Sequence, residues 1–277
     1  MAIKPAGGNG AVTWIDLGDI GLQCDLSGAG PSLVLLHELG GSLDSFDAVA
    51  PVLARDFRVL RFDQRGAGRS EKPRAAFSND DLVQDLARLV EAIGLPPPYR
   101  LVGIAAGAAV AVGFALAFPD QVAGLGLCAP ALTVAPDRRA YLTGRSDQAV
   151  DQGMRAIVDA TLDRSYPAHL RTADGPYAAY RARFLANDPV GYARANRALA
   201  DAVVEAELGR LAMPSLVLAG RHDLLRPPDM VRAIAARLPD AQFAVVESGH
   251  LMAVQAPAEL AARLTDFFHS LPNPRAS

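Results

Sequence analysis

Residues 99–119 read Tyr-Arg-Leu-Val-Gly-Ile-Ala-Ala-Gly-Ala-Ala-Val-Ala-Val-Gly-Phe-Ala-Leu-Ala-Phe-Pro. The apolar run over 99–104 is short and bounded by turn residues, as is typical of a buried parallel strand. The small residues over 106–118 predict a helix, which Pro119 closes. This stretch therefore predicts a buried strand that turns sharply into a helix.

The same alternation of strand and helix extends in both directions along the chain. Strands are expected over 32–37, 57–63, 122–130, 215–220 and 242–247, and helices after Asp44 and over 80–93, 228–238 and 257–270. A hairpin over 14–25 precedes them. Alternating strands and helices predict the α/β class, with a mainly parallel, doubly wound sheet wrapped by helices.

The alternation stops between Ala131 and Leu211, where the spacing is helical and no clear strand run is found. We therefore expect a core over 1–132, an inserted helical lid over 133–208, and the rest of the core over 209–277. A chain of 277 residues suits one large core with such an insertion.

Composition excludes several classes of protein. Hydrophobic residues make up 51% and charged residues 21%, which excludes disorder for most of the chain. A net charge of -3 offers no attraction for nucleic acid or anionic membranes, and no membrane span or signal peptide is evident. Cys24 and Cys128 lack metal or redox spacing, which favours a reducing cytoplasm. The expected partner is a small-molecule substrate, with a homodimer as the alternative to a monomer.

In a doubly wound sheet, ligands bind where the strands end, so the residues after each strand carry the functional signal. Five such ends are informative, namely His37-Glu38-Leu39-Gly40-Gly41, Asp63-Gln64-Arg65-Gly66-Ala67-Gly68, Gly103-Ile104-Ala105-Ala106-Gly107, Gly220-Arg221-His222-Asp223 and Glu247-Ser248-Gly249-His250.

In this order the five strand ends resemble the α/β-hydrolase superfamily, in which nucleophile, acid and histidine follow one another along the chain. The H-E-x-G-G-S run from His37 and the D-Q-R-G-x-G-x-S-E-K run from Asp63 are similar to 3-oxoadipate enol-lactonase-like proteins. The resemblance implies a lid-covered α/β-hydrolase fold, no cofactor, and an esterase or lactonase of aromatic catabolism.

The nucleophile position departs from that pattern. The elbow should read G-x-S-x-G, whereas this chain has Ala105 between the two glycines. Alanine has no nucleophilic atom, although the glycines still predict the tight turn. Either a serine was replaced to give an inactive form, or the natural protein works without a covalent serine.

The resemblance assigns a catalytic triad position to each of Ala105, Asp223 and His250. His250 is the general base and Asp223 orients its imidazole. The alternatives are a capping or surface histidine and a helix-capping aspartate. The oxyanion hole is assigned to the N–H groups of Leu39 and Ala106.

Two further candidates for substrate binding are Glu38 and Cys128. Glu38 stands where the resemblance predicts glycine. It either points into solvent or faces the pocket, where it would repel anionic substrates or serve as a second acid–base group. Cys128 ends the sixth strand and is either a substitute nucleophile or a buried inert thiol.

No metal cluster, Walker loop or dinucleotide fingerprint is found. Asp63 and Arg65 are expected to brace the loop below the site.

The lid arginines are nearly balanced by acidic residues, so most are expected on a solvated face, with one or two binding a substrate carboxylate. Three functions stay open on the residues alone. The leading one is a hydrolase of a small carboxylic ester or lactone. The alternatives are a non-hydrolytic lyase or cofactor-free oxygenase with His250 as base, and a catalytically silent ligand-binding protein.

Overall fold

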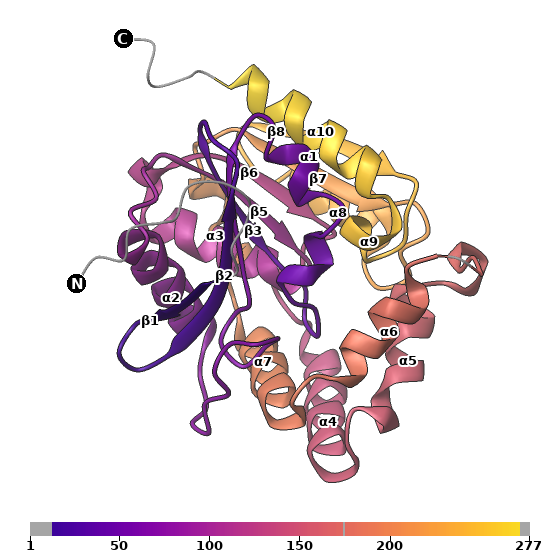
Figure 1. Cartoon of the computed structure of the whole chain (residues 1–277). Coiled ribbons are helices and arrows are strands. Elements are labelled where there is room, and N and C mark those ends of the chain that lie inside the picture. Colours follow the sequence, from indigo (N-terminus) through magenta and orange to yellow (C-terminus); the bar gives the residue numbers. More distant parts are fainter. Residues whose placement is uncertain (1–12, 174, 272–277) are drawn as a thin grey trace.

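The computed structural model describes residues 13–173 and 175–271. They form an eight-stranded sheet in the order β1-β2-β4-β3-β5-β6-β7-β8 (Figure 1). The strands are β1 Thr13–Asp16, β2 Gly21–Ser27, β3 Ser32–Leu36, β4 Arg58–Phe62, β5 Tyr99–Ile104, β6 Val122–Cys128, β7 Ser215–Gly220 and β8 Ala241–Val246. Pairing is parallel from β4 to β8 and antiparallel at β1–β2 and β2–β4, so the sheet is mainly parallel as predicted.

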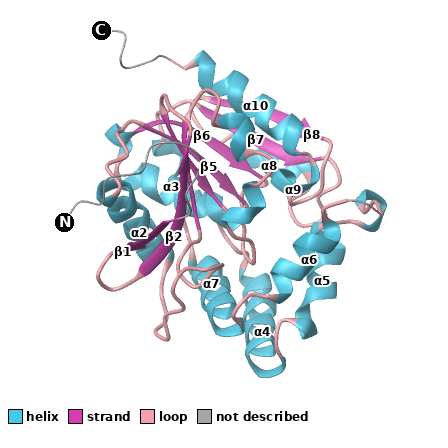
Figure 2. Cartoon of the chain, in the orientation of Figure 1, coloured by secondary structure: helices cyan, strands magenta, loops and turns pink. Residues whose placement is uncertain are grey.

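Helices cover both faces of this sheet (Figure 2). The core helices are α1 Ala50–Leu53, α2 Asn79–Ala92, α3 Ala106–Ala117, α8 Pro228–Ala235, α9 Met252–Gln255 and α10 Pro257–Ser270. The helix expected after Asp44 is instead a 3-10 turn, Leu43–Phe46, followed by the one-turn α1, because Ser42 caps the turn with its hydroxyl.

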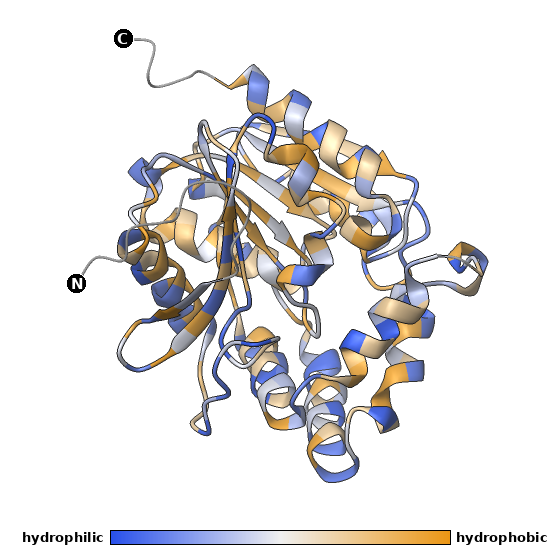
Figure 3. Ribbon diagram, in the orientation of Figure 1, coloured by the Kyte–Doolittle hydropathy of each residue, from blue (hydrophilic) through white to orange (hydrophobic). Residues whose placement is uncertain are grey.

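The strands supply apolar side chains to two separate cores. In β3, Val34 and Leu36 pack with α2, α3 and α8, whereas Leu33 and Leu35 pack with α1, α9 and α10. Successive residues of a strand point to opposite faces, so a strand buried on both sides reads as an unbroken apolar run. Figure 3 shows that apolar residues are concentrated in the sheet and in the helices that pack against it.

Four helices are inserted between β6 and β7, namely α4 Pro136–Gln152, α5 Arg155–Ser165, α6 Tyr177–Leu185 and α7 Pro189–Asp201. Figure 1 shows them as a group beside one end of the sheet. Within the described residues this insertion adds no strand to the sheet, and a single bridge between Thr133 and Val203 joins its two ends. We call α4–α7 the lid.

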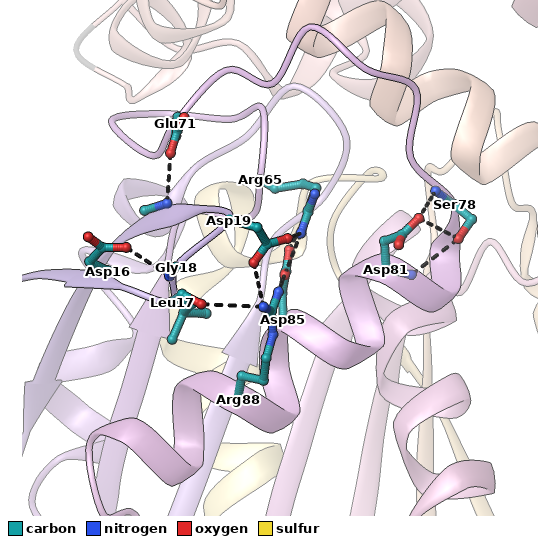
Figure 4. A network of polar contacts seen from close by, with 11 residues as sticks. Asp16, Leu17, Gly18, Asp19, Arg65, Glu71, Ser78, Asp81, Asp85 and Arg88 are labelled. Carbon is teal, nitrogen blue, oxygen red and sulfur yellow. Dashed lines mark hydrogen bonds and ion pairs between the residues drawn. The ribbon is translucent and has the colours of Figure 1, made fainter.

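The loop after β4 is braced by buried ion pairs (Figure 4). Arg65 donates to both carboxylate oxygens of Asp85 on α2 at 2.6 and 2.7 Å, and Arg88 donates to the same carboxylate at 2.7 Å. Asp63 accepts the backbone N–H groups of Leu43 and Arg69, each at 2.7 Å. Both residues therefore have the bracing role predicted for them.

Among the described residues, every helix is too short or too polar to cross a membrane.

Candidate active site

The turn at Ala105 has the strained backbone of a nucleophile elbow. Ala105 has φ 49° and ψ -110°, and α3 begins at the next residue. A Cβ at Gly103 would lie 2.5 Å from Ala108 N, and one at Gly107 would lie 2.3 Å from Leu36 O. The two glycines are needed because α3 passes this close to β5 and to the end of β3. The turn predicted from them is present, with a methyl group where the resemblance predicts a hydroxyl.

His250 and Asp223 form a buried hydrogen-bonded pair. His250 Nδ1 lies 2.8 Å from Asp223 Oδ2, and the other carboxylate oxygen accepts the N–H groups of Leu225 and Arg226 at 2.7 and 2.9 Å. With Nδ1–H donating to the carboxylate, Nε2 carries the lone pair of the neutral ring and has no hydrogen-bond partner in the described chain. Nε2 is therefore free to take a proton from a substrate or a water molecule.

The lid contributes to the position of this histidine. The backbone N–H of His250 donates to the carbonyl of Ser165, the last residue of α5, at 3.1 Å. By contrast, His222 binds Glu247 at 2.5 Å between Nε2 and Oε1. The hydrogen bonds from His222 and Arg221 hold the pKa of Glu247 below its usual range. His222 is thus hydrogen-bonded to a surface carboxylate.

Leu39 and Ala106, whose N–H groups are the predicted oxyanion hole, line the same cavity as Ala105 and His250. Neither donates to an acceptor in the described part of the chain. The loop that carries Leu39 is fixed by His37, whose Nδ1 donates to Glu38 O at 2.8 Å and whose Nε2 accepts from Gln64 N at 3.1 Å. Two unoccupied donors on a rigid loop and a helix start are suited to stabilising an oxyanion.

Glu38 faces inward, not into solvent. Its side chain is buried, with 3% of the residue exposed, and it lines the cavity. Oε1 accepts a hydrogen bond from Ser45 Oγ at 2.7 Å and another from Tyr180 OH at 2.8 Å. Tyr180 belongs to α6, 142 positions away, and nothing in the sequence indicates this pairing. Burial and the neighbouring Glu38 raise the pKa of Tyr180 well above its usual value, so its hydroxyl stays a donor.

The cavity has a volume of about 420 Å³ and lies between the strand ends and the lid. Four arginines line it, namely Arg138, Arg145, Arg164 and Arg226. Within the described residues none of the four forms an ion pair with a carboxylate. Glu38 is the one acidic residue among the described lining residues. The cavity therefore has an excess of positive charge opposite the reactive histidine.

Two of these arginines are held in place by neutral groups. Arg145 donates to Tyr192 OH at 3.0 Å and to the hydroxyl of Thr161, while its Nε is buried without a partner. Arg226 makes only long contacts, to Met230 Sδ and Thr133 O at 3.4 Å, and burial lowers its pKa. The sequence interpretation included Arg145 among the lid arginines but missed Arg226.

Cys128 does not line the cavity. The thiol is fully buried in the core with Val102, Leu218 and Met252, on the α10 side of the sheet. Burial raises its pKa to about 12. The expectation that Cys128 contacts substrate is therefore wrong, and the geometry fits the inert thiol. The described residues also include no cluster of three metal-ligating side chains.

Neither thiol should react with iodoacetamide in the native protein at about pH 8. Both Cys24 and Cys128 are buried, and the pKa of each is raised to about 12, so the thiolate fraction is negligible. Mass spectrometry should find no adduct on the native chain and two adducts after unfolding. A single adduct on native protein at Cys128 would instead return that residue to the list of candidate nucleophiles.

Comparison with known proteins identifies the family of this chain. A family model described as "alpha/beta hydrolase fold" matches residues 31–257. A protein of Caulobacter segnis named for carbamate hydrolysis (RutD) is 32% identical over 237 residues, covering 83% of this chain and 88% of that protein. A fluoroacetate dehalogenase of Burkholderia is 28% identical over 284 residues, covering 91% and 92%.

Two solved structures have the same fold as this chain. The enol-lactonase of Burkholderia xenovorans superposes with a TM-score of 0.87 at 26% identity, covering 93% of this chain and all of that one. A thermophilic esterase of Thermogutta terrifontis, solved with malate bound, has a TM-score of 0.87 at 26% identity, covering 95% and 98%.

Proposed function

Because the chain belongs to the α/β-hydrolase fold family, we propose that it hydrolyses a small carboxylic ester or lactone that carries a second, anionic group. The observation that carries this proposal is the buried His250–Asp223 pair, whose Nε2 has no partner in the described chain and whose histidine lines a cavity together with Leu39 and Ala106. A base, an oxyanion hole and an enclosed pocket are the requirements of acyl transfer.

The nucleophile in this proposal is water. His250 Nε2 takes a proton from water as the water oxygen attacks the carbonyl carbon, and the carbonyl electron pair moves to oxygen. The N–H groups of Leu39 and Ala106 stabilise that oxyanion, and Asp223 stabilises the imidazolium. His250 then returns the proton to the leaving oxygen as its bond to carbon breaks. Ala105 takes no part beyond leaving space for the water.

The substrate class follows from the cavity arginines. Guanidinium groups that lack a carboxylate partner favour a ligand that supplies one, and arginine binds carboxylates with two parallel hydrogen bonds. The malate in the Thermogutta esterase structure is a dicarboxylate, which is consistent with this substrate class. The names enol-lactonase and carbamate hydrolase both describe cleavage beside a carbonyl group.

The test is turnover by the unaltered protein. Mono-4-nitrophenyl succinate is a suitable probe because it combines an aryl ester with a free carboxylate, and dihydrocoumarin supplies a lactone. Release of the phenol above the buffer rate supports the proposal. If neither probe nor a wider ester and lactone panel turns over, hydrolysis by water attack in the alanine form is refuted.

One non-hydrolytic reaction is favoured by a specific observation. A methyl group at position 105 leaves the histidine base with no hydroxyl to activate. The same base could therefore remove a proton directly from a carbon acid, as in a lyase or a cofactor-free oxygenase. Exchange of substrate C–H for deuterium in D₂O, without hydrolysis, would identify this reaction.

Replacing Arg145 or Arg226 by glutamine should weaken binding of the anionic probe. Each change removes a charged hydrogen bond of about 1.5–3 kcal/mol, so KM for mono-4-nitrophenyl succinate should rise by about 10–100-fold with little change in kcat. The methyl ester of the same probe should show no such rise. Arg197→Gln is the matched control, because that lid arginine pairs with Asp147 and lies outside the cavity lining. Equal KM values for all three variants would refute an anion site.

A further inference from the structure

Glu38 is a buried carboxylate that the reaction proposed above does not use. It forms no ion pair with any cation in the described chain, and its two hydrogen-bond donors are the neutral hydroxyls of Ser45 and Tyr180. Burying a charge without a counter-charge is unfavourable. A side chain that served only to join the lid to the core could be a glutamine, whose amide oxygen accepts the same two hydrogen bonds.

The two carboxylate oxygens of Glu38 have different surroundings. Both hydrogen bonds end on Oε1, which holds that oxygen between η1 (Leu43–Phe46) and α6. Oε2 has no hydrogen-bond partner in the described chain. Unlike the unpartnered atoms Asp25 Oδ1 and Arg145 Nε, it is not fully enclosed by protein. Since Glu38 lines the cavity together with Ala105 and His250, one oxygen is anchored and the other is available to a molecule inside.

We infer that Glu38 is a catalytic residue that holds the attacking water together with His250. The inference rests on the proposed hydrolysis. A serine nucleophile is held by its own covalent bonds, whereas a water molecule in the space over Ala105 has to be oriented by hydrogen bonds. One O–H of the water donates to His250 Nε2 and the other donates to Glu38 Oε2, which directs a lone pair of the water oxygen at the carbonyl carbon.

The step balances without a further reactant. The bond from water oxygen to the carbonyl carbon forms as the first proton moves to Nε2 and the carbonyl electron pair moves to oxygen. When that pair returns, the bond to the leaving oxygen breaks, and the leaving oxygen takes the proton from Nε2. The second water proton stays on the new carboxylic acid, which then loses it to solvent.

The charge of Glu38 is consistent with the missing hydroxyl. A carboxylate that lines the same cavity as Ala105 opposes the negative charge that a serine would develop as it loses its proton. The same carboxylate favours the imidazolium that forms on His250 when water is the nucleophile. Glu38 and Ala105 therefore both favour direct attack by water over formation of an acyl-enzyme.

The test is Glu38→Gln, measured with mono-4-nitrophenyl succinate beside His250→Ala and Tyr180→Phe. The glutamine keeps the acceptor for Ser45 and Tyr180 but presents an amide to the water. We expect kcat to fall by about 10²-fold or more, with KM changed less than about 3-fold and Tm unchanged. Tyr180→Phe removes one donor to Oε1 and should lower kcat much less. Because Tyr180 connects the lid to the core, its loss should lower Tm instead.

The other outcomes separate this inference from the proposed function. If His250→Ala is inactive while Glu38→Gln keeps full kcat, Glu38 is only a bridge between lid and core, and the inference is overturned. A change confined to KM would make it a substrate contact and also overturn the inference. If both variants stay active, the proposed mechanism with His250 as the base fails. Should Glu38→Gln not fold, Glu38→Ala with added formate replaces it, where recovery of kcat supports the inference and no recovery refutes it.

Discussion

Replacing His250 by alanine is expected to lower kcat/KM for mono-4-nitrophenyl succinate by about 10²–10⁴-fold, the usual contribution of a general base. The reason is that Nε2 is the one ring nitrogen left free for proton transfer, since Nδ1 is bound to Asp223. The measurement is initial-rate release of 4-nitrophenolate, with Tm recorded in parallel.

His169→Ala is the control for the loss of an imidazole. His169 is an exposed lid residue outside the cavity lining, so its removal should leave the rate unchanged. A His250→Ala protein that is folded and keeps wild-type turnover would show that the buried pair is not the base.

Introducing serine at Ala105 is expected to create a covalent acyl-enzyme. The elbow backbone is already present, so the new hydroxyl enters the position that faces the histidine base in this family. Release of 4-nitrophenolate should begin with a burst. In a site adapted to water, as proposed above, the steady-state rate should not rise, whereas an alanine that replaced a native serine would give a rise of several orders of magnitude, since a triad nucleophile contributes that much. Intact-mass spectrometry should find the succinyl adduct on the serine variant and not on the alanine protein.

The size of the rise distinguishes the two origins of the alanine. A large gain over an inert parent indicates that the alanine form is inactivated. An active parent that gains little, or loses activity as the hydroxyl displaces the water beside Glu38, indicates a site adapted to alanine. A folded serine variant with neither burst nor adduct would contradict the placement of Ala105 opposite His250.

Local patterns predicted the reactive pair because each member directly follows a strand. Asp223 and His250 stand after β7 and β8, and parallel strands bring their carboxyl ends to the same edge of the sheet. Apolar runs and glycines indicate such ends from a few residues alone. That information was sufficient for a mainly parallel sheet and for a helical insertion between β6 and β7.

The sequence patterns could not show which distant segments contact one another. No local rule pairs Tyr180 with Glu38, so whether Glu38 faced solvent or the cavity depended on how α6 docks. Cys128 was misplaced for a different reason. Leu127 packs on the α3 side and Cys128 on the α10 side, and a strand buried on both faces has no polar residues to show which side is which.

The bridge between Thr133 and Val203 has a consequence for how this molecule diversifies. The chain leaves the sheet after β6 and returns to it at the neighbouring strand β7, and the bridge joins the two ends of the inserted segment. The length or sequence of that segment can therefore change without altering the strand order. The entropy of closing such a segment grows only slowly with its length. A replacement lid needs a carbonyl for the N–H of His250 and a hydroxyl for Glu38, the two lid contacts described above for those residues. With those two contacts kept, we expect that the lid of a relative could replace this one without changing the strand order of the core.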